Sequence, residues 1–443
     1  MDTPIYDFLC RYNARSTTRF HMPGHKGIVF LGCEHLDLTE IHGADALYEA
    51  AGIIARSEAN ATALFGTQRT CYSTEGSSQC IRAMLYLTLT NRPAGAAPVI
   101  VAARNVHKSF IYAAAMLDAE VVWLYPQENT SLCRCPITAA QLEETLAALD
   151  APPAAVYVTS PDYLGGMADI SALAEVAHRH GTILAVDNAH GAYLRFLQPS
   201  LHPLDLGADI CCDSAHKTLP ALTGSAYLHI GKTAPEAFAD HAKAALALFG
   251  STSPSYLILA SLDLCNRTLA EGYTERLGTM VKALEGLREA LRVGGWQVEE
   301  SDPLRLTLRM PTGLTGNRLS ETLSARGMEC EYADEDFLVL MLTPENREEE
   351  LAAFAAALGK NEADYVPPAI LPTARGERAR SIREAVFAPH ETVPAAQAEG
   401  RICASPAVSC PPAIPIVISG ERITAEAAAL FARYGIESVD VLK

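Results

Sequence analysis

Short apolar runs alternate with longer amphipathic stretches over the first 260 residues of the chain. The runs are rich in Val, Ile and Ala and have the length of buried strands, whereas the stretches between them repeat apolar residues at helical spacing. The predicted strands are 97–102, 120–124, 154–159, 182–186 and 210–212, and the predicted helices are 77–89, 108–117, 139–149 and 170–180. This alternation is typical of an α/β domain with a mostly parallel sheet and crossover helices.

The pattern changes after about residue 255. Residues 255–293 place Leu, Ala and Met three or four positions apart, which predicts a long connecting helix. Predicted strands at 305–309 and 337–342 and helices at 317–326 and 345–358 form a small α+β unit, and a proline-rich stretch at 364–372 precedes a distinct tail. We therefore expect three parts: residues 1–255, 256–365 and 366–443.

Charge and composition narrow the class of protein. The 443 residues allow two to four domains, and the formal charge is −17 with no Lys/Arg-rich block, which argues against nucleic acid or an anionic membrane as a partner. Residues 1–19 carry charges at several positions and lack an apolar run, so they resemble neither a secretory signal nor a membrane anchor. We expect a cytoplasmic protein.

Twelve cysteines are spread along the chain without paired spacing, which favours reduced thiols over a disulfide framework. The close groups, Cys133 with Cys135 and Cys211 with Cys212, lack the second cluster that a zinc site needs. Pro and Gly between His21 and His25 also prevent the helical spacing of a metal motif. The sequence therefore predicts no metal site.

Lys217 follows directly on a predicted buried strand, next to Ser214 and His216. A partly buried lysine has a lowered pKa and supplies a nucleophilic amine for a Schiff base. By itself the motif is weak, because an exposed loop lysine fits the same pattern.

An acid at another strand end strengthens this interpretation. Asp187 directly follows the predicted strand 182–186. The ring of pyridoxal phosphate (PLP) accepts electrons when its pyridine nitrogen is protonated, and a carboxylate beside that nitrogen keeps it so. Ala189 would leave a small, flat surface against such a ring. The alternative role for Asp187 is to cap a helix.

Two further elements fit the same cofactor. Gly76, Ser77 and Ser78 precede a predicted helix, where backbone N–H groups and hydroxyls bind phosphate. His107 follows the strand at 97–102 and offers an imidazole that could stack on a ring. Either element alone is as well explained by a helix cap or a structural histidine.

Taken in order, these elements resemble the Orn/Lys/Arg decarboxylases, PLP enzymes of the aspartate-aminotransferase fold (fold type I), over nearly the whole chain. The matching segments are Phe20 to Gly27 (FHMPGHKG), Arg104 to Ser109 (RNVHKS), Asp187 to Tyr193 (DNAHGAY), Ser214 to Thr223 (SAHKTLPALT) and, in the tail, Phe387 to Pro394 (FAPHETVP) and Pro411 to Pro415 (PPAIP). The larger members carry an additional N-terminal domain, whereas here the first motif begins near residue 20, so we expect a short form.

The resemblance assigns a role to each element. It implies that Lys217 binds PLP as a Schiff base, that Asp187 pairs with the ring nitrogen and that His107 stacks on the ring. It also implies that the phosphate or its surroundings are held by Gly76, Ser77, Ser78, Ser214 and His216. It also implies a homodimer with shared active sites, in which Ser251 or Thr252 donates a hydroxyl to the partner's phosphate, and it implies that Glu331 of the small domain faces the substrate.

Some positions depart from the family pattern. Glu75 stands where the phosphate loop has Asn, Asn188 and Tyr193 replace Glu and His around Asp187, and in the tail Ala413 and Ser419 replace Gly and Pro. A carboxylate at position 75 is unfavourable near a phosphate unless it points away.

The expected activity is PLP-dependent α-decarboxylation of arginine, lysine or ornithine to the corresponding polyamine-pathway amine. An aminotransferase or lyase of the same fold would use the same Lys217 and Asp187, although the sequence identifies no arginine that would grip the substrate carboxylate. A non-catalytic protein on this fold is a second alternative. Retention of His107, Asp187 and Lys217 together argues against it.

Overall fold

The structure is a computed structural model of the chain and describes residues 1–15, 17–92, 96–127, 130–366, 370–371, 375–408 and 413–443. Cys410, Pro411 and Pro412, which belong to the cysteine set and the tail motif, lie outside the described residues. The chain forms two compact units, one made of Met1–Pro93 with Ile183–Arg276 and the other of Ala94–Thr182 with Leu277–Lys443. The predicted three-part division stays a prediction.

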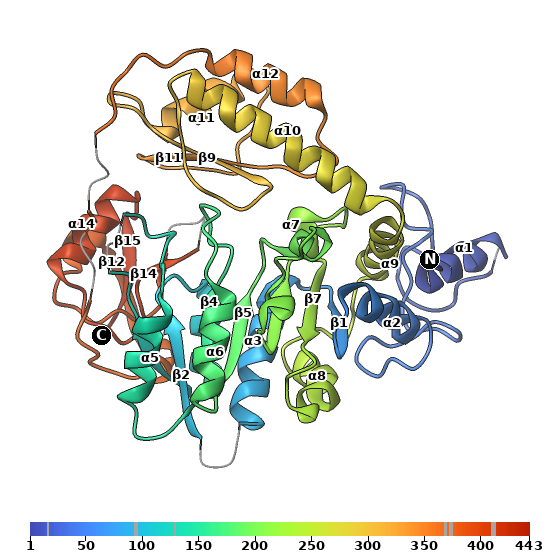
Figure 1. Cartoon of the computed structure of the whole chain (residues 1–443). Helices are drawn as coiled ribbons and strands as arrows, with labels where there is room; N and C mark the ends of the chain where they lie inside the picture. The colour runs from blue at the N-terminus through green and yellow to red at the C-terminus, as the bar shows by residue number, and fades with distance from the viewer. Residues whose placement is uncertain (16, 93–95, 128–129, 367–369, 372–374, 409–412) are drawn as a thin grey trace. The chain divides into compact units, whose positions relative to one another are not determined.

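The first unit brings together segments from two separate stretches of the chain (Figure 1). Its strands are β1 (Arg69–Ser73), β5 (Ile183–Asp187), β6 (Ile210–Asp213) and β7 (Ala226–Ile230), and its helices are α1 (Pro4–Ala14), α2 (Ile53–Phe65), α3 (Gly76–Thr90), η1 (Ala192–Phe196), η2 (Pro203–Leu206), α7 (Ala215–Thr218), α8 (Glu236–Leu248) and α9 (Tyr256–Ala270). The strands lie in the order β1-β7-β6-β5; β5 and β6 are parallel, and β7 is antiparallel to both of its neighbours. Every residue of β5 and β6 is buried, as central strands of an α/β sheet require.

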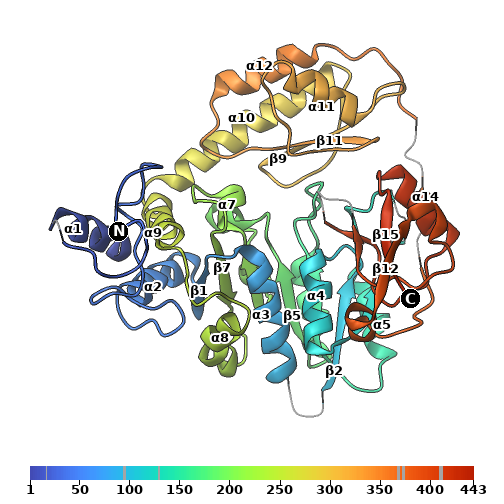
Figure 2. The ribbon, with the colours of Figure 1, turned by 180° about the vertical axis from the view of Figure 1, so that it is seen from behind.

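The second unit contains three parallel strands with helices on both faces. They are β2 (Ala97–Ala103), β3 (Glu120–Leu124) and β4 (Pro153–Thr159), in the order β4-β2-β3. Helix α4 (Lys108–Leu117) connects β2 to β3, α5 (Ala139–Ala147) connects β3 to β4, and α6 (Ile170–Arg179) follows β4. Helices α5 and α6 lie on one face of these strands and α4 on the other, as opposite views show (Figures 1 and 2).

A small antiparallel sheet follows in the same unit. Its strands are β8 (Gln297–Val298), β9 (Arg305–Arg309), β10 (Tyr332–Ala333) and β11 (Phe337–Met341), in the order β10-β11-β9-β8. The associated helices are α10 (Tyr273–Val293), within which the chain passes from the first unit to the second, α11 (Gly316–Ser324) and α12 (Glu348–Leu358).

The last part of the second unit, residues 375–408 and 413–443, is called the C-terminal segment below. It contains α13 (Ile382–Phe387), β12 (His390–Pro394), η3 (Ala395–Gln397), β13 (Ala407–Val408), β14 (Pro415–Val417), α14 (Ala425–Arg433) and β15 (Ser438–Leu442). β12 pairs with β15 and β13 with β14, both antiparallel. The side chains of α14 and β15 share one apolar cluster, whose members include Leu430, Phe431 and Val441.

The predicted fold class is confirmed. Of the five strand pairs that β1 to β7 form within the two units, three are parallel, and each strand predicted in the first 260 residues is present to within one residue at either end. The long helix expected at 255–293 is instead two helices, α9 and α10, because Gly272 adopts a left-handed backbone conformation (φ 77°) that ends the first. None of the described helices is both long enough and apolar enough to cross a membrane.

Candidate active site

The carboxyl ends of β5 and β6 bring two of the predicted site residues together. The strands are parallel and Asp187 is in register with Cys212, so the turn that begins at Ser214 starts beside Asp187. Asp187 is buried, and its Oδ1 accepts hydrogen bonds from the N–H of Ala189 (3.2 Å) and from the Sγ of Cys212 (3.7 Å). The two parallel, fully buried strands therefore place Asp187 at the end of β5 and the Ser-Ala-His-Lys turn, residues 214–217, directly after β6.

Lys217 lies in α7, a single helical turn at the end of β6. Its backbone N–H donates to the carbonyl of Ser214 (3.1 Å), and its Nζ lies 3.0 Å from Nε2 of His190. His190 is buried and follows Asp187 by three residues. Sequence reasoning did not assign a role to His190, although it lies within the motif 187–193. The signal that identifies it is its distance to Lys217.

Hydroxyl groups and backbone N–H groups gather at the start of α3. Ser214 Oγ donates to Ser77 Oγ (2.8 Å), which links the β6 turn to the first turn of the helix. Gly76 has a left-handed backbone (φ 71°), its N–H donates to the carbonyl of Gly224 (2.8 Å), and a Cβ at this position would meet no atom within 4 Å. There is therefore room beside Gly76, and the dipole at a helix N-terminus favours an anion there.

His216 faces the other way along the same turn. Its Nδ1 donates to the carbonyl of Ser225 (2.9 Å), and burial lowers the pKa of the imidazole. With Nδ1 donating to the Ser225 carbonyl, the neutral ring offers its second nitrogen, Nε2, as a hydrogen-bond acceptor.

The carboxylate of Glu75 is bonded to the segment that follows α8. Its Oε1 accepts the N–H of Ser251, and Ser251 and Thr252 are both exposed. Glu75, which directly precedes the predicted phosphate residues 76–78, is thus bonded to the backbone of Ser251 within the first unit.

Asn188 is fixed by a buried ionic network. Its Nδ2 donates to Oδ1 of Asp213 (2.6 Å), while Oδ2 of Asp213 lies 3.1 Å from Nε2 of both His202 and His229. Burial alone would raise the pKa of Asp213, but the two imidazoles hold it below its usual range. The donor atoms of His202, Cys211 and Asp213 lie within 4.8 Å of one another. Because the Asp213 carboxylate already takes part in three hydrogen bonds, we interpret the cluster as a hydrogen-bonded network.

The remaining predicted residues belong to the second unit. His107 is the N-cap of α4: its Nδ1 accepts the backbone N–H of Ser109 (3.2 Å). Glu331 is exposed beside β10 and accepts a hydrogen bond from the hydroxyl of Tyr163 (2.8 Å), which comes from the loop after β4. Each residue thus has a defined place within its own unit.

Comparison with known proteins gives two family matches. The model of the Orn/Lys/Arg decarboxylase major domain matches residues 3–310, and that of the Orn/Lys/Arg decarboxylase C-terminal domain matches residues 369–434. The chain belongs to the Orn/Lys/Arg decarboxylase family. Its relatives are thus PLP-dependent amino-acid decarboxylases, and this chain is an enzyme of that kind.

Individual relatives agree with this assignment. An arginine decarboxylase of Bacillus subtilis is 29% identical over 96% of this chain and 92% of its own length, and an uncharacterized Bacillus subtilis protein, YaaO, is 30% identical over 96% and 93%. Among solved structures, the lysine decarboxylase of Francisella novicida superposes with a TM-score of 0.82 at 16% identity, covering 100% of this chain and 81% of that one.

The residues of the first unit fit PLP, the cofactor of this decarboxylase family. The cofactor carries a phosphate, an aldehyde and a basic ring nitrogen, and the unit offers an open helix N-terminus with two linked hydroxyls, a half-buried lysine and a buried carboxylate. Among the described residues, none has an atom within 4 Å of a Cβ added at Gly76, so this end of the helix has room for a phosphate.

Two departures from the family pattern have partners in the structure. Asn188 stands where the motif has Glu, and its neighbour Asp213 already supplies a carboxylate, so a second one at 188 would be repelled in the core. Glu75 stands where the motif has Asn, and its carboxylate is bonded to the Ser251 N–H. Tyr193 is fully buried in η1, and nothing in the structure explains why it replaces His.

Proposed function

We propose that this decarboxylase removes the α-carboxylate of a basic amino acid, arginine, lysine or ornithine, to give agmatine, cadaverine or putrescine and CO₂. The observation that carries the proposal is the convergence of Lys217, His190 and Asp187 at the ends of β5 and β6, within a chain of this family. PLP supplies an electron sink for the electron pair that remains when CO₂ leaves.

In this proposal the first unit holds the cofactor. Gly76, Ser77, Ser78 and Ser214 bind the phosphate, and His216 supports the turn that carries Ser214. Asp187 keeps a proton on the ring nitrogen because its carboxylate is buried and already oriented by the Ala189 N–H. Ala189 leaves room for the ring.

Proton transfer falls to groups close to the reacting carbon. Lys217 Nζ is within hydrogen-bond distance of His190 Nε2, so a proton can pass between these two side chains. His107 or Lys217 would donate the proton that replaces CO₂ at Cα.

The substrate's cationic side chain needs a carboxylate, and we assign Glu331 to it. The Tyr163 hydroxyl donates to Oε1 of Glu331 and so orients the carboxylate. Replacing Glu331 with Gln should raise KM for the basic substrate by about tenfold with a smaller effect on kcat, since the lost charge pair forms before the chemical step. A KM equal to that of the wild type would exclude this role.

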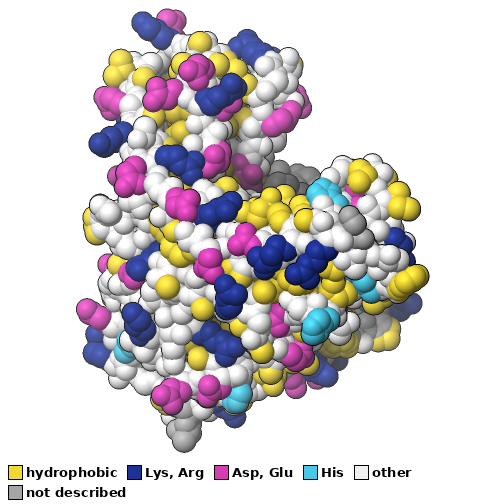
Figure 3. All heavy atoms as spheres, turned by 90° about the vertical axis from the view of Figure 1, so that its right-hand side faces the viewer, with side chains coloured by type: hydrophobic (Ala, Val, Ile, Leu, Met, Phe, Trp, Pro, Cys, Tyr) yellow, Lys and Arg dark blue, Asp and Glu magenta, His cyan; other side chains and the backbone are white. Residues whose placement is uncertain are grey.

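The proposed working unit is a homodimer in which Ser251 or Thr252 reaches the partner's phosphate. Both residues are exposed. The N-terminal segment 20–31 also exposes apolar side chains, of which Phe20, Ile28, Phe30 and Leu31 are each more than two-thirds exposed. Hydrophobic side chains gather between charged ones on the face seen in Figure 3. Such exposed apolar surface is typical of an interface. A cytoplasmic location remains a prediction of the sequence.

A substrate panel tests the proposed reaction. Purified enzyme with PLP is incubated with arginine, lysine and ornithine, and both CO₂ and the amine are measured. We expect equimolar CO₂ and amine from at least one of them. Keto-acid formation without CO₂ would instead identify an aminotransferase and reject the proposal.

A matched pair of lysine variants tests the site. Lys217→Ala should lose both activity and the long-wavelength absorbance of lysine-bound PLP, while Lys232→Ala, at an exposed lysine of the same unit, should keep both. Absorbance that persists in Lys217→Ala would show that another residue binds the cofactor.

A further inference from the structure

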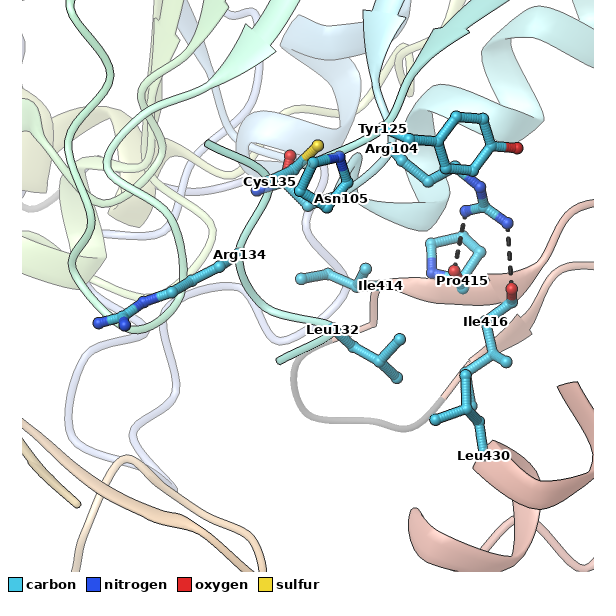
Figure 4. A pocket seen from close by; sticks show the side chains of 11 residues that line it. Arg104, Asn105, Tyr125, Leu132, Arg134, Cys135, Ile414, Pro415, Ile416 and Leu430 are labelled. Carbon is cyan, nitrogen blue, oxygen red and sulfur yellow. Dashed lines mark hydrogen bonds between the residues drawn. The ribbon is translucent and has the colours of Figure 1, made fainter. Parts of the chain in front are cut away.

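The segment that carries His107 is bonded to the C-terminal segment on both sides of the histidine. Arg104, at the end of β2, donates from Nη1 to the carbonyl of Pro415 (2.9 Å) and from Nη2 to that of Ile416 (3.0 Å), as Figure 4 shows. The backbone N–H of Lys108 donates to the carbonyl of Ala413 (2.9 Å). Residues 413–416 are therefore bonded to the side chain three positions before His107 and to the backbone one position after it.

The Arg104 contact is buried and charged. Nη2 also lies 3.3 Å from Oε2 of Glu421, and the guanidinium carbon lies 5.6 Å from the centre of the Trp123 ring. Arg104 is 9% exposed, and burial raises the pKa of Glu421 although Arg104 opposes that shift. A guanidinium holds several donors in one rigid plane, and a lysine cannot reproduce that geometry.

The other end of α4 is held by the same C-terminal segment. Arg383, in α13, donates from Nη1 to the carbonyls of Ala115 (3.1 Å) and Met116 (3.0 Å). These carbonyls lie in the last turn of α4, where no intrahelical partner is available. The helix capped by His107 is thus bonded at both ends to residues near the end of the chain.

One local feature shows that this arrangement is imposed by its surroundings. Ala413 has a left-handed backbone (φ 61°), which costs a residue with a side chain about 1 kcal/mol. The family pattern has Gly at this position. Strained conformations persist where neighbouring contacts determine them, and here the carbonyl of Ala413 is directed at the Lys108 N–H.

We propose that Arg104 is a positioning residue for His107, and that through it the C-terminal segment sets the position of the imidazole. The inference rests on the role proposed for His107. Arg104 acts through the backbone of 104–108 and through the cap of α4. A displacement of about 1 Å in a stacking or proton-transferring group is enough to lower a rate by up to about a hundredfold.

The test compares Arg104→Met with a matched control. Arg378 also bonds the C-terminal segment to the β3 strand, through Glu120 (2.7 Å), but both side chains are more than half exposed. Arg104→Met should weaken PLP binding to the apoenzyme by about tenfold, lower kcat more than KM and increase hydrogen exchange in residues 104–117. Arg378→Met should change the PLP affinity, kcat, KM and the hydrogen exchange of residues 104–117 by less than about twofold.

A double variant distinguishes positioning from general stability. If Arg104 acts through His107, Arg104→Met adds no further loss of PLP affinity to His107→Ala; independent effects would multiply. Should Arg104→Met fail to fold, Arg104→Lys and Glu421→Gln keep part of the contact and are measured in the same way. Wild-type PLP affinity and exchange in the folded Arg104 variants would overturn the proposal.

The same data separate this inference from the proposed role of His107. If His107→Ala binds PLP and turns over like the wild type, the assignment of His107 is wrong whatever Arg104 does. If His107→Ala weakens PLP binding and the Arg104 variants do not, only the positioning role is wrong.

Discussion

At the scale of single residues, the buried Asn188–Asp213 pair shows how one substitution depends on its neighbour. The amide of Asn188 donates to a carboxylate that two imidazoles keep ionised. A buried carboxylate is tolerated when every oxygen has a donor, as here, and becomes costly when a second negative charge replaces one of those donors.

We therefore expect Asn188→Asp to lower the free energy of unfolding by about 3 kcal/mol at pH 8, since it places two carboxylates in hydrogen-bond contact in the core. Urea unfolding measures the change. The double variant with Asp213→Asn restores one amide and one carboxylate and should recover part of the loss. A single variant as stable as the wild type would show that the pair does not constrain position 188.

The pKa of Asp162, in the loop after β4, is shifted in the opposite direction to that of Asp213. Burial raises its pKa to about 6, although its Oδ1 accepts the N–H groups of Leu164 (2.9 Å) and Gly166 (2.8 Å). Because the pKa is higher in the folded state, the contribution of Asp162 to stability is complete at low pH and is lost as pH rises through about 6.

Asp162→Asn keeps an acceptor for both N–H groups and removes the ionisation. The variant should gain stability relative to the wild type as pH rises from 5 to 8, by about 1 kcal/mol over that interval. Parallel urea titrations at the two pH values test this. A difference between variant and wild type that does not vary with pH would contradict the raised pKa.

At the scale of elements, α9 and α10 show where a pattern of apolar residues is ambiguous. Apolar spacing continues through 255–293, and a glycine within such a pattern does not by itself end a helix. Gly272 ends it because its left-handed conformation turns the chain, whereas Gly278 is helical and has no atom within 4 Å of an added Cβ.

The two glycines give predictions of opposite sign. Gly272→Ala should lower the free energy of unfolding by about 1 kcal/mol, because alanine strains the left-handed backbone. Gly278→Ala should raise it by about 0.5 to 1 kcal/mol, because alanine restricts the unfolded chain and favours the helix. Each serves as the control for the other in urea unfolding, and equal signs would refute the explanation of the break.

Strand positions and the order of the site motifs were predictable from sequence, because buried strands and the residues at their ends are local features. Lys217 and Asp187 are predicted as site residues in this way. The side-chain contacts of the site were not predictable from sequence. The contact of Lys217 with His190 depends on two neighbouring strands, and the contact of Arg104 with Pro415 joins residues 311 positions apart. No local pattern encodes such pairs, since they exist only after the chain has folded.

At the scale of the whole molecule, the exposed apolar side chains bear on how two copies of the chain would associate. The proposed homodimer predicts that the exposed apolar side chains of segment 20–31 lie in the interface, where their burial would contribute most of the association energy.

Ile28→Ser with Phe30→Ser should therefore shift the protein from dimer to monomer in analytical ultracentrifugation at micromolar concentration. Val293→Ser is the control, since Val293 is 80% exposed but belongs to another part of the chain. A wild-type monomer would reject the dimer, and a double variant that stays dimeric would move the interface elsewhere.

The contact between Arg104 and Glu421 also sets an order of events during synthesis. The two residues are 317 positions apart, so at typical translation speeds Arg104 leaves the ribosome roughly 15 to 60 s before its partner. Asp187 and Lys217 are made in that interval, and the phosphate-binding residues 76–78 are made before it. A nascent chain can therefore assemble these groups before the His107 segment acquires its support from the C-terminal segment.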